Sequence, residues 1–364
     1  MATASRILEE SFRIGAGRYI QGSGVISMLG GECVRLGASR PVVIGGETAL
    51  SITRERIEAA LEGEGLSADF YTYKGHCGDD GVERLMKSFK AGRDVVIGVG
   101  GGVIMDTAKH LAVKMGVPVI NIPTSSATCA AYTPLSVCYK VDGAKDRTEH
   151  HKVEVAAVLA DMDVLSTQPA RLFLSGAYDA MAKLYELRQR MLGVDISECD
   201  VGLASSYHLS IFMLDLLKSN LAGCISDVKE GKSTKRLYDS VYASIALCGV
   251  VSGLARGSNQ TALAHKVYEV LRSNYSDTVR PYLHGELVAL GLVLQIAYNG
   301  EGDPVAFARE LRENSIPASL SDLGIADKEC VEHIYNSLVA STAMQGTSTE
   351  EQKHLRDSLE YLIG

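Results

Sequence analysis

The chain has 364 residues, of which 46% are hydrophobic and 22% charged, and its formal net charge is −8. This length suits one large or two ordinary domains, and the acidic balance without a basic cluster argues against nucleic acid as a partner. The first ten residues lack the apolar stretch of a signal peptide, no run of about 20 apolar residues could span a membrane, and the cysteines form no C-x-x-C pair. These features predict a cytoplasmic protein with reduced thiols and no membrane partner.

The first 160 or so residues alternate between short apolar segments and helix-like ones. Strands are expected at 41–44, 69–73, 95–99, 117–122 and 156–160, with helices such as 53–64 and 81–90 between them. Short apolar strands separated by helices are typical of βαβ units. An α/β N-terminal domain with a parallel sheet is therefore predicted.

The pattern changes at about Asp163 to helix-length segments with one apolar face. These segments lie at 170–192, 203–222, 234–254, 259–273, 284–299 and 304–313, whereas 274–277 and 345–349 have the composition of loops. The sequence therefore predicts two domains, an α/β domain over 1–163 and an all-α domain over 164–364.

A glycine run, Gly98-Val99-Gly100-Gly101-Gly102, ends the strand expected at 95–99, and a helical pattern begins at once. Glycines at such a turn let the backbone approach a ligand, and the N-terminus of the following helix attracts phosphate. The run is not the common dinucleotide fingerprint, because it follows two earlier strands and no acid lies at 118–124. A tight structural turn is the alternative interpretation.

A loop rich in small hydroxyl residues follows the strand that ends at Ile122. Its residues Thr124, Ser125, Ser126 and Thr128 are suited to bind phosphates or a nicotinamide carboxamide beside the glycine run. A capping loop with no ligand has the same composition, so the sequence leaves both interpretations open.

Three residues of the helical half have the chemistry of metal ligands. Asp179, His265 and His284 each lie in an otherwise apolar, helix-length segment. One carboxylate and two imidazoles form a typical catalytic site for Zn²⁺ or Fe²⁺ with a coordination position open for substrate. Taken singly, Asp179 could also be a helix-terminal acid and each histidine a core residue, and spacing does not decide, since the three belong to different helices.

Taken together, these motifs resemble the iron-containing, glycerol-dehydrogenase-like alcohol dehydrogenase family over essentially the whole chain. The matching residues are Gly100 to Gly102 with Asp106, Thr107, Ala108 and Lys109, then Pro123-Thr124, Leu135-Ser136-Val137, Tyr139, Asp179, His265 and Leu283-His284-Gly285-Glu286. The segments around Cys77 and Cys129 look most similar to the hydroxycarboxylate dehydrogenase branch. The resemblance implies the dehydroquinate synthase-like (group III alcohol dehydrogenase) fold, with nucleotide bound by 1–163 and metal by 164–364.

The resemblance also implies roles for individual residues. Asp179, His265 and His284 would bind the metal, with zinc expected over iron, Tyr268 would relay protons and Cys129 would face the substrate. The residues implied for binding NAD(H) or NADP(H) are Gly100, Gly101, Gly102, Asp106, Thr124, Ser125, Ser126, Ala127, Thr133, Leu135 and Tyr139.

The chain departs from the family pattern at four positions. Cys129 replaces an aspartate that binds polyols in glycerol-type members, which favours a 2-oxo or 2-hydroxy acid over glycerol. Gly46 replaces the acid that binds the ribose 2′-hydroxyl in NAD-preferring members, so NADP(H) becomes acceptable. Tyr268 replaces a histidine, and Tyr178, beside a ligand, is expected to narrow the pocket.

The predicted function is metal-dependent hydride transfer between a nicotinamide cofactor and a small alcohol or carbonyl, most consistent with a 2-hydroxy or 2-oxo acid. The small-molecule substrate is the expected partner, together with further copies of the chain in a homo-oligomer. The alternatives are a polyol dehydrogenase, a sn-glycerol-1-phosphate dehydrogenase or dehydroquinate-synthase-like enzyme, and a non-catalytic cofactor-binding protein. The phosphate-binding alternatives need cations near the ligands, for which Arg256 and Lys266 are the candidates.

Overall fold

The computed structural model describes residues 13–141, 143, 145–255 and 260–364. The chain forms two compact units. The sheet unit comprises Phe12–Gly176 and Leu216–Gly253, and the helical unit comprises Ala177–Asp215 and Leu254–Gly364.

The sheet unit is built on six parallel strands in the order β1-β8-β5-β4-β2-β3. Their bounds are β1 Tyr19–Gly22, β2 Pro41–Gly45, β3 Asp69–Thr72, β4 Val95–Gly100, β5 Val119–Pro123 and β8 Ala157–Asp161. The parallel sheet and five predicted strands are confirmed. The sequence analysis missed β1, because this short edge strand is half-buried throughout and carries no apolar run.

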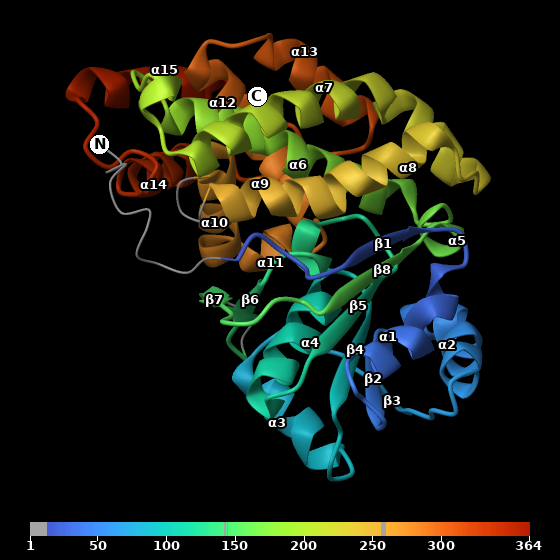
Figure 1. Ribbon diagram of the computed structural model, residues 1–364. Coiled ribbons are helices and arrows are strands. Elements are labelled where there is room, and N and C mark those ends of the chain that lie inside the picture. Colours follow the sequence, from blue (N-terminus) through green and yellow to red (C-terminus); the bar gives the residue numbers. More distant parts are fainter. Residues whose placement is uncertain (1–12, 142, 144, 256–259) are drawn as a thin grey trace. The chain divides into compact units, whose positions relative to one another are not determined.

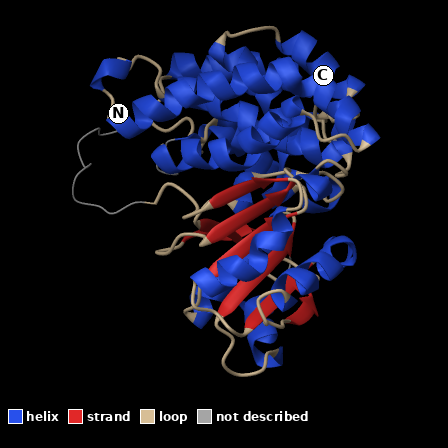
Figure 2. Cartoon of the chain, turned by 45° about the vertical axis from the view of Figure 1, so that its right-hand side comes forward, coloured by secondary structure: helices blue, strands red, loops and turns tan. Residues whose placement is uncertain are grey.

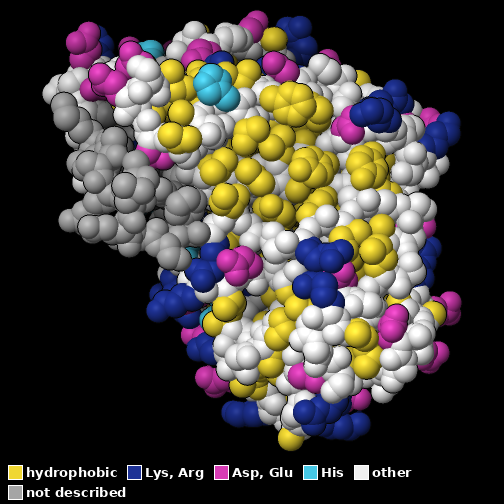
Figure 3. Space-filling model, viewed as in Figure 1, with side chains coloured by type: hydrophobic (Ala, Val, Ile, Leu, Met, Phe, Trp, Pro, Cys, Tyr) yellow, Lys and Arg dark blue, Asp and Glu magenta, His cyan; other side chains and the backbone are white. Residues whose placement is uncertain are grey.

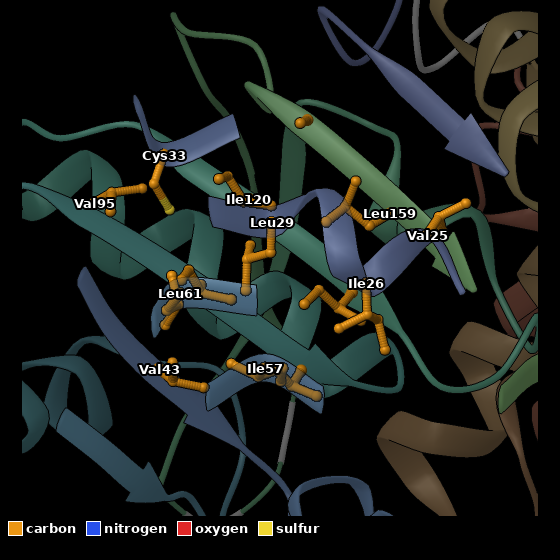
Figure 4. Close-up of a cluster of buried hydrophobic side chains, with 14 of the residues drawn as sticks. Val25, Ile26, Leu29, Cys33, Val43, Ile57, Leu61, Val95, Ile120 and Leu159 are labelled. Atoms are coloured by element: carbon orange, nitrogen blue, oxygen red, sulfur yellow. The ribbon is translucent and has the colours of Figure 1, made fainter. Parts of the chain in front are cut away.

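Helices cover both faces of this sheet (Figures 1 and 2). On one face lie α1 (Leu29–Arg35) and α2 (Glu47–Glu62), and on the other lie α3 (Asp79–Ser88) and α4 (Gly102–Met115). The first face forms a buried cluster in which Ile57 and Leu61 of α2 join Val43, Val95 and Ile120 of the strands (Figure 4). Side chains alternate along a strand, so neighbouring residues such as Val96 face the opposite way. The near-continuous apolar strands follow from burial on both faces.

An antiparallel hairpin, β6 (Leu135–Tyr139) and β7 (Lys145–His150), lies outside the main sheet. Residues 145–150 are all polar or charged, with half-buried and exposed positions alternating. The composition of β7 carries no apolar signal, which explains why this strand, and with it the pairing of the hairpin, was not predicted.

Residues 216–253 also belong to the sheet unit. They form the end of α7 (Val201–Glu230), α8 (Lys235–Tyr242), the π-helical turn η4 (Ala243–Leu247) and most of α9 (Cys248–Leu254). Tyr238 and Gln21 exchange two hydrogen bonds of 2.8 and 3.0 Å, and the Tyr242 ring lies 5.5 Å from that of Tyr19. The two observed units therefore do not coincide with the predicted domains 1–163 and 164–364, because these helices attach to the edge strand β1.

The helical unit contains no strand among its described residues. Most of α6 (Ala170–Arg190) and the first half of α7 belong to this unit. Its other helices are α10 (Leu263–Asn274), α11 (Ser276–Val279), α12 (His284–Asn299), α13 (Pro304–Glu313), α14 (Lys328–Val339) and α15 (Thr349–Ile363). Helix α12 is apolar all round and is packed by α10, α13 and α15, so it forms the core of the unit. The predicted all-α region is confirmed, although α11 takes the place of the loop expected at 274–277.

By length and composition alone, Val201–Glu230 and the continuous helix Lys235–Leu254 could cross a membrane. Core helices of water-soluble proteins meet the same criteria. In the second helix, 67% of the most apolar window is buried inside the protein.

Candidate active site

Asp179, His265 and His284 converge in the helical unit, although they come from three helices. Asp179 lies on α6, His265 in the first turn of α10, and His284 is the first residue of α12. The Nε2 atoms of His265 and His284 lie 3.3 and 3.6 Å from Oδ1 of Asp179. One ligand atom from each residue lies within 4.8 Å of the other two. The structure therefore assembles the three residues that the sequence could not place together.

The residues fit a divalent metal ion. Oδ1 of Asp179 is buried and accepts no hydrogen bond, which is costly for a carboxylate oxygen unless a cation binds it. Asp179 and His265 are buried, whereas the His284 side chain is 31% exposed, so the cluster is open on that side. One carboxylate and two imidazoles match zinc or ferrous iron and do not distinguish between them.

A buried cation adjoins the cluster. Lys183, one helical turn after Asp179, places Nζ 3.7 Å from Oδ1 of Asp179, and both side chains are 6% exposed. Burial raises the pKa of Asp179, but the charge of Lys183 and the two histidines outweigh this effect, and the pKa falls well below its ordinary value. The carboxylate is therefore ionised and ready to bind a metal.

Glu186 lies behind His265. Its Oε2 is 2.6 Å from Nδ1 of His265, and its Oε1 accepts the backbone N–H groups of Ala262 and His265 at 2.8 and 2.9 Å. The Glu186 side chain is fully buried. Burial raises its pKa, but the charge and hydrogen bonds of His265 lower it further, so Glu186 is also ionised.

The side chains of Tyr268 and Tyr178, the two tyrosines near the ligands, point in different directions. The Tyr268 ring packs edge-on against His284, with 4.3 Å between ring centroids. Tyr178 is completely buried, donates its hydroxyl to Glu310 at 2.8 Å and packs against Phe307. The expectation that Tyr178 narrows the metal pocket is wrong, because its ring is directed towards α13.

In the sheet unit, the glycine run and the hydroxyl-rich loop lie side by side. Gly100 has φ +153°, a value that favours glycine, and its carbonyl accepts the N–H of Thr124 at 3.0 Å. A Cβ built on Gly101 would lie 3.5 Å from Oγ of Ser125, and one on Gly102 would lie 3.0 Å from Oγ1 of Thr128. Backbone N–H groups at the start of α4 and these hydroxyls thus share one edge of the sheet, where ligands of parallel sheets bind.

Asp106 and Lys109 of α4 hold the hairpin in place. Oδ2 of Asp106 accepts the N–H of Val137 at 3.1 Å, and Nζ of Lys109 lies 2.9 Å from Oδ1 of Asp106. Lys109 also donates to the carbonyl of Thr133 at 3.0 Å and to that of Leu135. These contacts give the D-x-x-K pair a structural role that the sequence analysis did not foresee.

The other predicted cofactor and substrate residues have mixed surroundings. Ser126 is fully buried and its hydroxyl bonds Gln168 at 3.1 Å, so this side chain serves to anchor the loop. The remaining positions are as follows: Thr124, Leu135 and Tyr139 are half-buried, Ala127 and Thr133 are buried, and Cys129 is half-buried at the start of η2 (Cys129–Ala131).

Sequence reasoning missed Lys183 and Glu186. The signal was their spacing from Asp179, four and seven residues along one helix, which places all three on one face. Of the two cations named for a phosphate, Arg256 lies outside the described residues, and Lys266 pairs with Glu269 at 2.7 Å. No phosphate-binding group of cations follows from them.

A doubly covered parallel sheet with a glycine turn, and a helical unit with one acid and two histidines, define a metal-dependent nucleotide-linked enzyme. The model of the family "Iron-containing alcohol dehydrogenase" matches residues 16–162. Hydroxycarboxylate dehydrogenase A of Escherichia coli (strain K12) is 32% identical over 79% of this chain and 78% of that protein. Glycerol dehydrogenase of Thermotoga maritima is 29% identical over 85% of this chain and 84% of that protein.

The fold is similar to that of solved dehydrogenase structures. The crystal structure of glycerol dehydrogenase from Schizosaccharomyces pombe superposes with a TM-score of 0.82, at 21% identity, over 97% of this chain and 91% of that one. The chain belongs to the iron-containing alcohol dehydrogenase family. It is accordingly an oxidoreductase of the NAD(P)- and metal-dependent type, as the sequence predicted.

Proposed function

We propose that the protein interconverts a small 2-oxo acid and the corresponding 2-hydroxy acid, with NADP(H) as an accepted cofactor. The observation that carries this proposal is the buried cation Lys183 beside Asp179. The 32% identity to a protein named hydroxycarboxylate dehydrogenase A supports the same substrate class.

The charges of the cluster favour an anionic substrate. Asp179 and Glu186 supply two negative charges, which a divalent ion would balance, and Lys183 then leaves the loaded centre with excess positive charge. In a site of low dielectric this excess attracts a carboxylate and does little for a neutral polyol. Cys129, in place of an acid, adds no charge that would repel the carboxylate.

Asp179, His265 and His284 would hold the metal. When bound, a zinc or ferrous ion supplies Lewis acidity toward the oxygen of a carbonyl or alcohol. The protein's own residues position the reactants: the start of α4 and Ser125 offer donors to the cofactor, and Tyr268, packed on His284, is the candidate proton relay. A bound nicotinamide would supply hydride-transfer chemistry.

The end of β2 supports the use of NADP(H). Gly46 follows β2 without an acidic side chain, and Glu47 is drawn into an exposed ion pair with Lys74 at 2.7 Å. Glu47 and Lys74 line a hollow of about 590 Å³, together with Thr72, Tyr73 and Arg84 among others. Lys74 pairs with Glu47 and Arg84 pairs with Asp80 at 2.8 Å, so these cations would bind a ribose 2′-phosphate at this edge of the sheet by exchanging a carboxylate for the phosphate.

The test is reductase activity of the zinc-loaded protein with 2-oxo acids, neutral aldehydes and ketones, each with NADPH and NADH. We expect kcat/KM for 2-oxo acids to exceed that for neutral carbonyls at least about 10-fold, and Lys183→Met to lower this ratio about 10-fold. We also expect NADPH to be at least as efficient as NADH. The ratio of the two activities is the readout, because loss of metal would lower both activities together. An unchanged ratio in Lys183→Met contradicts the role of Lys183.

Other outcomes favour other functions. Turnover of polyols alone supports a polyol dehydrogenase, and turnover only of phosphorylated substrates supports the phosphate-binding alternatives. No turnover despite bound metal supports a non-catalytic cofactor-binding protein. A strong preference for NADH contradicts the proposed use of NADP(H).

We further propose a cytoplasmic homo-oligomer, without membrane or nucleic-acid partners. All eight cysteines are free thiols, as in reducing compartments.

The proposed oligomer rests on an exposed apolar surface. Residues 201–214 of α7 contain no Asp, Glu, Lys or Arg, and Val201 and Phe212 are 82% and 57% exposed. Hydrophobic side chains gather on the face drawn in Figure 3. Contact with another copy would cover such a surface, so sedimentation equilibrium is expected to show a dimer or larger, whereas a stable monomer contradicts this.

A further inference from the structure

The structure assigns Glu186 as the positioning residue that keeps His265 in the tautomer able to bind metal. This inference rests on the proposed metal site and adds a residue outside the three ligands. The contact between Oε2 of Glu186 and Nδ1 of His265 is 2.6 Å. The other oxygen of this carboxyl group accepts two backbone N–H groups, so the group acts as an acceptor and the hydrogen in this contact is assigned to Nδ1 of His265. The lone pair of the neutral ring then lies on Nε2, the atom directed at Asp179.

Glu186 also fixes where His265 lies. Its Oε1 accepts the N–H groups of Ala262 and His265, which begin α10. The two N–H groups between them are accepted by Gln189 and Gln295, at 3.3 and 3.2 Å. Four successive donors of this helix N-terminus are therefore bound by side chains of α6 and α12. One side chain, Glu186, thus holds both the backbone and the ring of a single ligand.

These contacts make the Glu186→Gln variant informative. The two backbone N–H groups at Oε1 would keep the oxygen of a glutamine in that position, since an NH₂ group there would face two donors. The NH₂ group of the glutamine would therefore face Nδ1 of His265 and donate to it. The hydrogen of the ring would move to Nε2, where it blocks the metal.

The experiment measures zinc affinity by competition with a chelator, and the tautomer by ¹⁵N shifts of the His265 ring in alkaline buffer without metal. The His265 signal is the one that the His265→Gln variant lacks. We expect Glu186→Gln to bind zinc about 10- to 100-fold more weakly than the unmodified protein. We also expect hydrogen on Nδ1 in the unmodified protein and on Nε2 in Glu186→Gln.

Glu310→Gln is the matched control, because it makes the same chemical change at a residue that contacts Tyr178 and not the ligands. Its zinc affinity should equal that of the unmodified protein. Equal affinity of Glu186→Gln and Glu310→Gln overturns the inference, as does hydrogen on Nε2 in the unmodified protein. If the unmodified protein and Glu310→Gln both bind no zinc, the proposed metal site itself is wrong. If both bind zinc and Glu186→Gln binds it equally well, only the role of Glu186 is wrong. The tautomer measurement needs no metal and no turnover, so it tests Glu186 even in a weakened variant.

Discussion

Replacing Asp179 with asparagine is expected to abolish metal retention and to lower kcat/KM by at least about 10³-fold, the equivalent of several kcal/mol of lost Lewis-acid stabilisation. Asp179 contributes the only carboxylate of the described cluster, and both histidine Nε2 atoms lie within 3.6 Å of its Oδ1. The amide keeps the shape of the side chain but loses the charge that balances Lys183 and a divalent ion. Metal content after dialysis and steady-state kinetics would measure both effects.

Tyr178→Phe provides the control at the neighbouring position. It removes a hydroxyl that bonds Glu310 and leaves the cluster untouched, so metal content and kcat/KM should stay close to those of the unmodified protein. His284→Ala should behave like Asp179→Asn, since it removes a second ligand. Full activity in Asp179→Asn and His284→Ala would show that these residues do not form the active site.

Gly176→Ala is expected to destabilise the protein by about 3 kcal/mol and to weaken cofactor binding. A methyl group at this position of α6 would lie 1.7 Å from the carbonyl oxygen of Ser126 and 3.0 Å from the carbonyl carbon of Ala127. These are backbone atoms of the hydroxyl-rich loop, so no side-chain rotation relieves the overlap. The loop must move away from the glycine turn, which it meets through Thr124 and Gly100. Thermal unfolding and titration of reduced-nicotinamide fluorescence would measure the two effects.

Gly31→Ala is the matched control in the same unit. Gly31 lies in α1, and a Cβ there meets nothing within 4 Å, so alanine should be neutral or stabilise the helix slightly. If Gly176→Ala unfolds at the same temperature as Gly31→Ala, the close approach of α6 to the loop does not exist in solution.

The strands and helices that were predicted correctly are those in which the order of apolar and polar residues matches the side chains that the fold buries. Strands β4 and β5 are fully buried and consist largely of β-branched residues, and α12 is a long apolar segment within the all-α region. The edge strand β1 and the hairpin strand β7 were missed, because partial exposure leaves them without an apolar run. Helix α14 was also missed, since only Ile334 and Leu338 of its twelve residues are buried.

The sequence by itself determined the class of the enzyme. The glycine run, the hydroxyl-rich loop and three ligand-type residues occur in an order that local chemistry and family resemblance could interpret. Only the tertiary structure decided which side chains meet. It brought Asp179, His265 and His284 together from three helices, turned Tyr178 away, and revealed Lys183 and Glu186 beside them. The physical reason is that contacts between residues about 80 to 100 positions apart depend on how helices pack, which no local pattern of a single chain encodes.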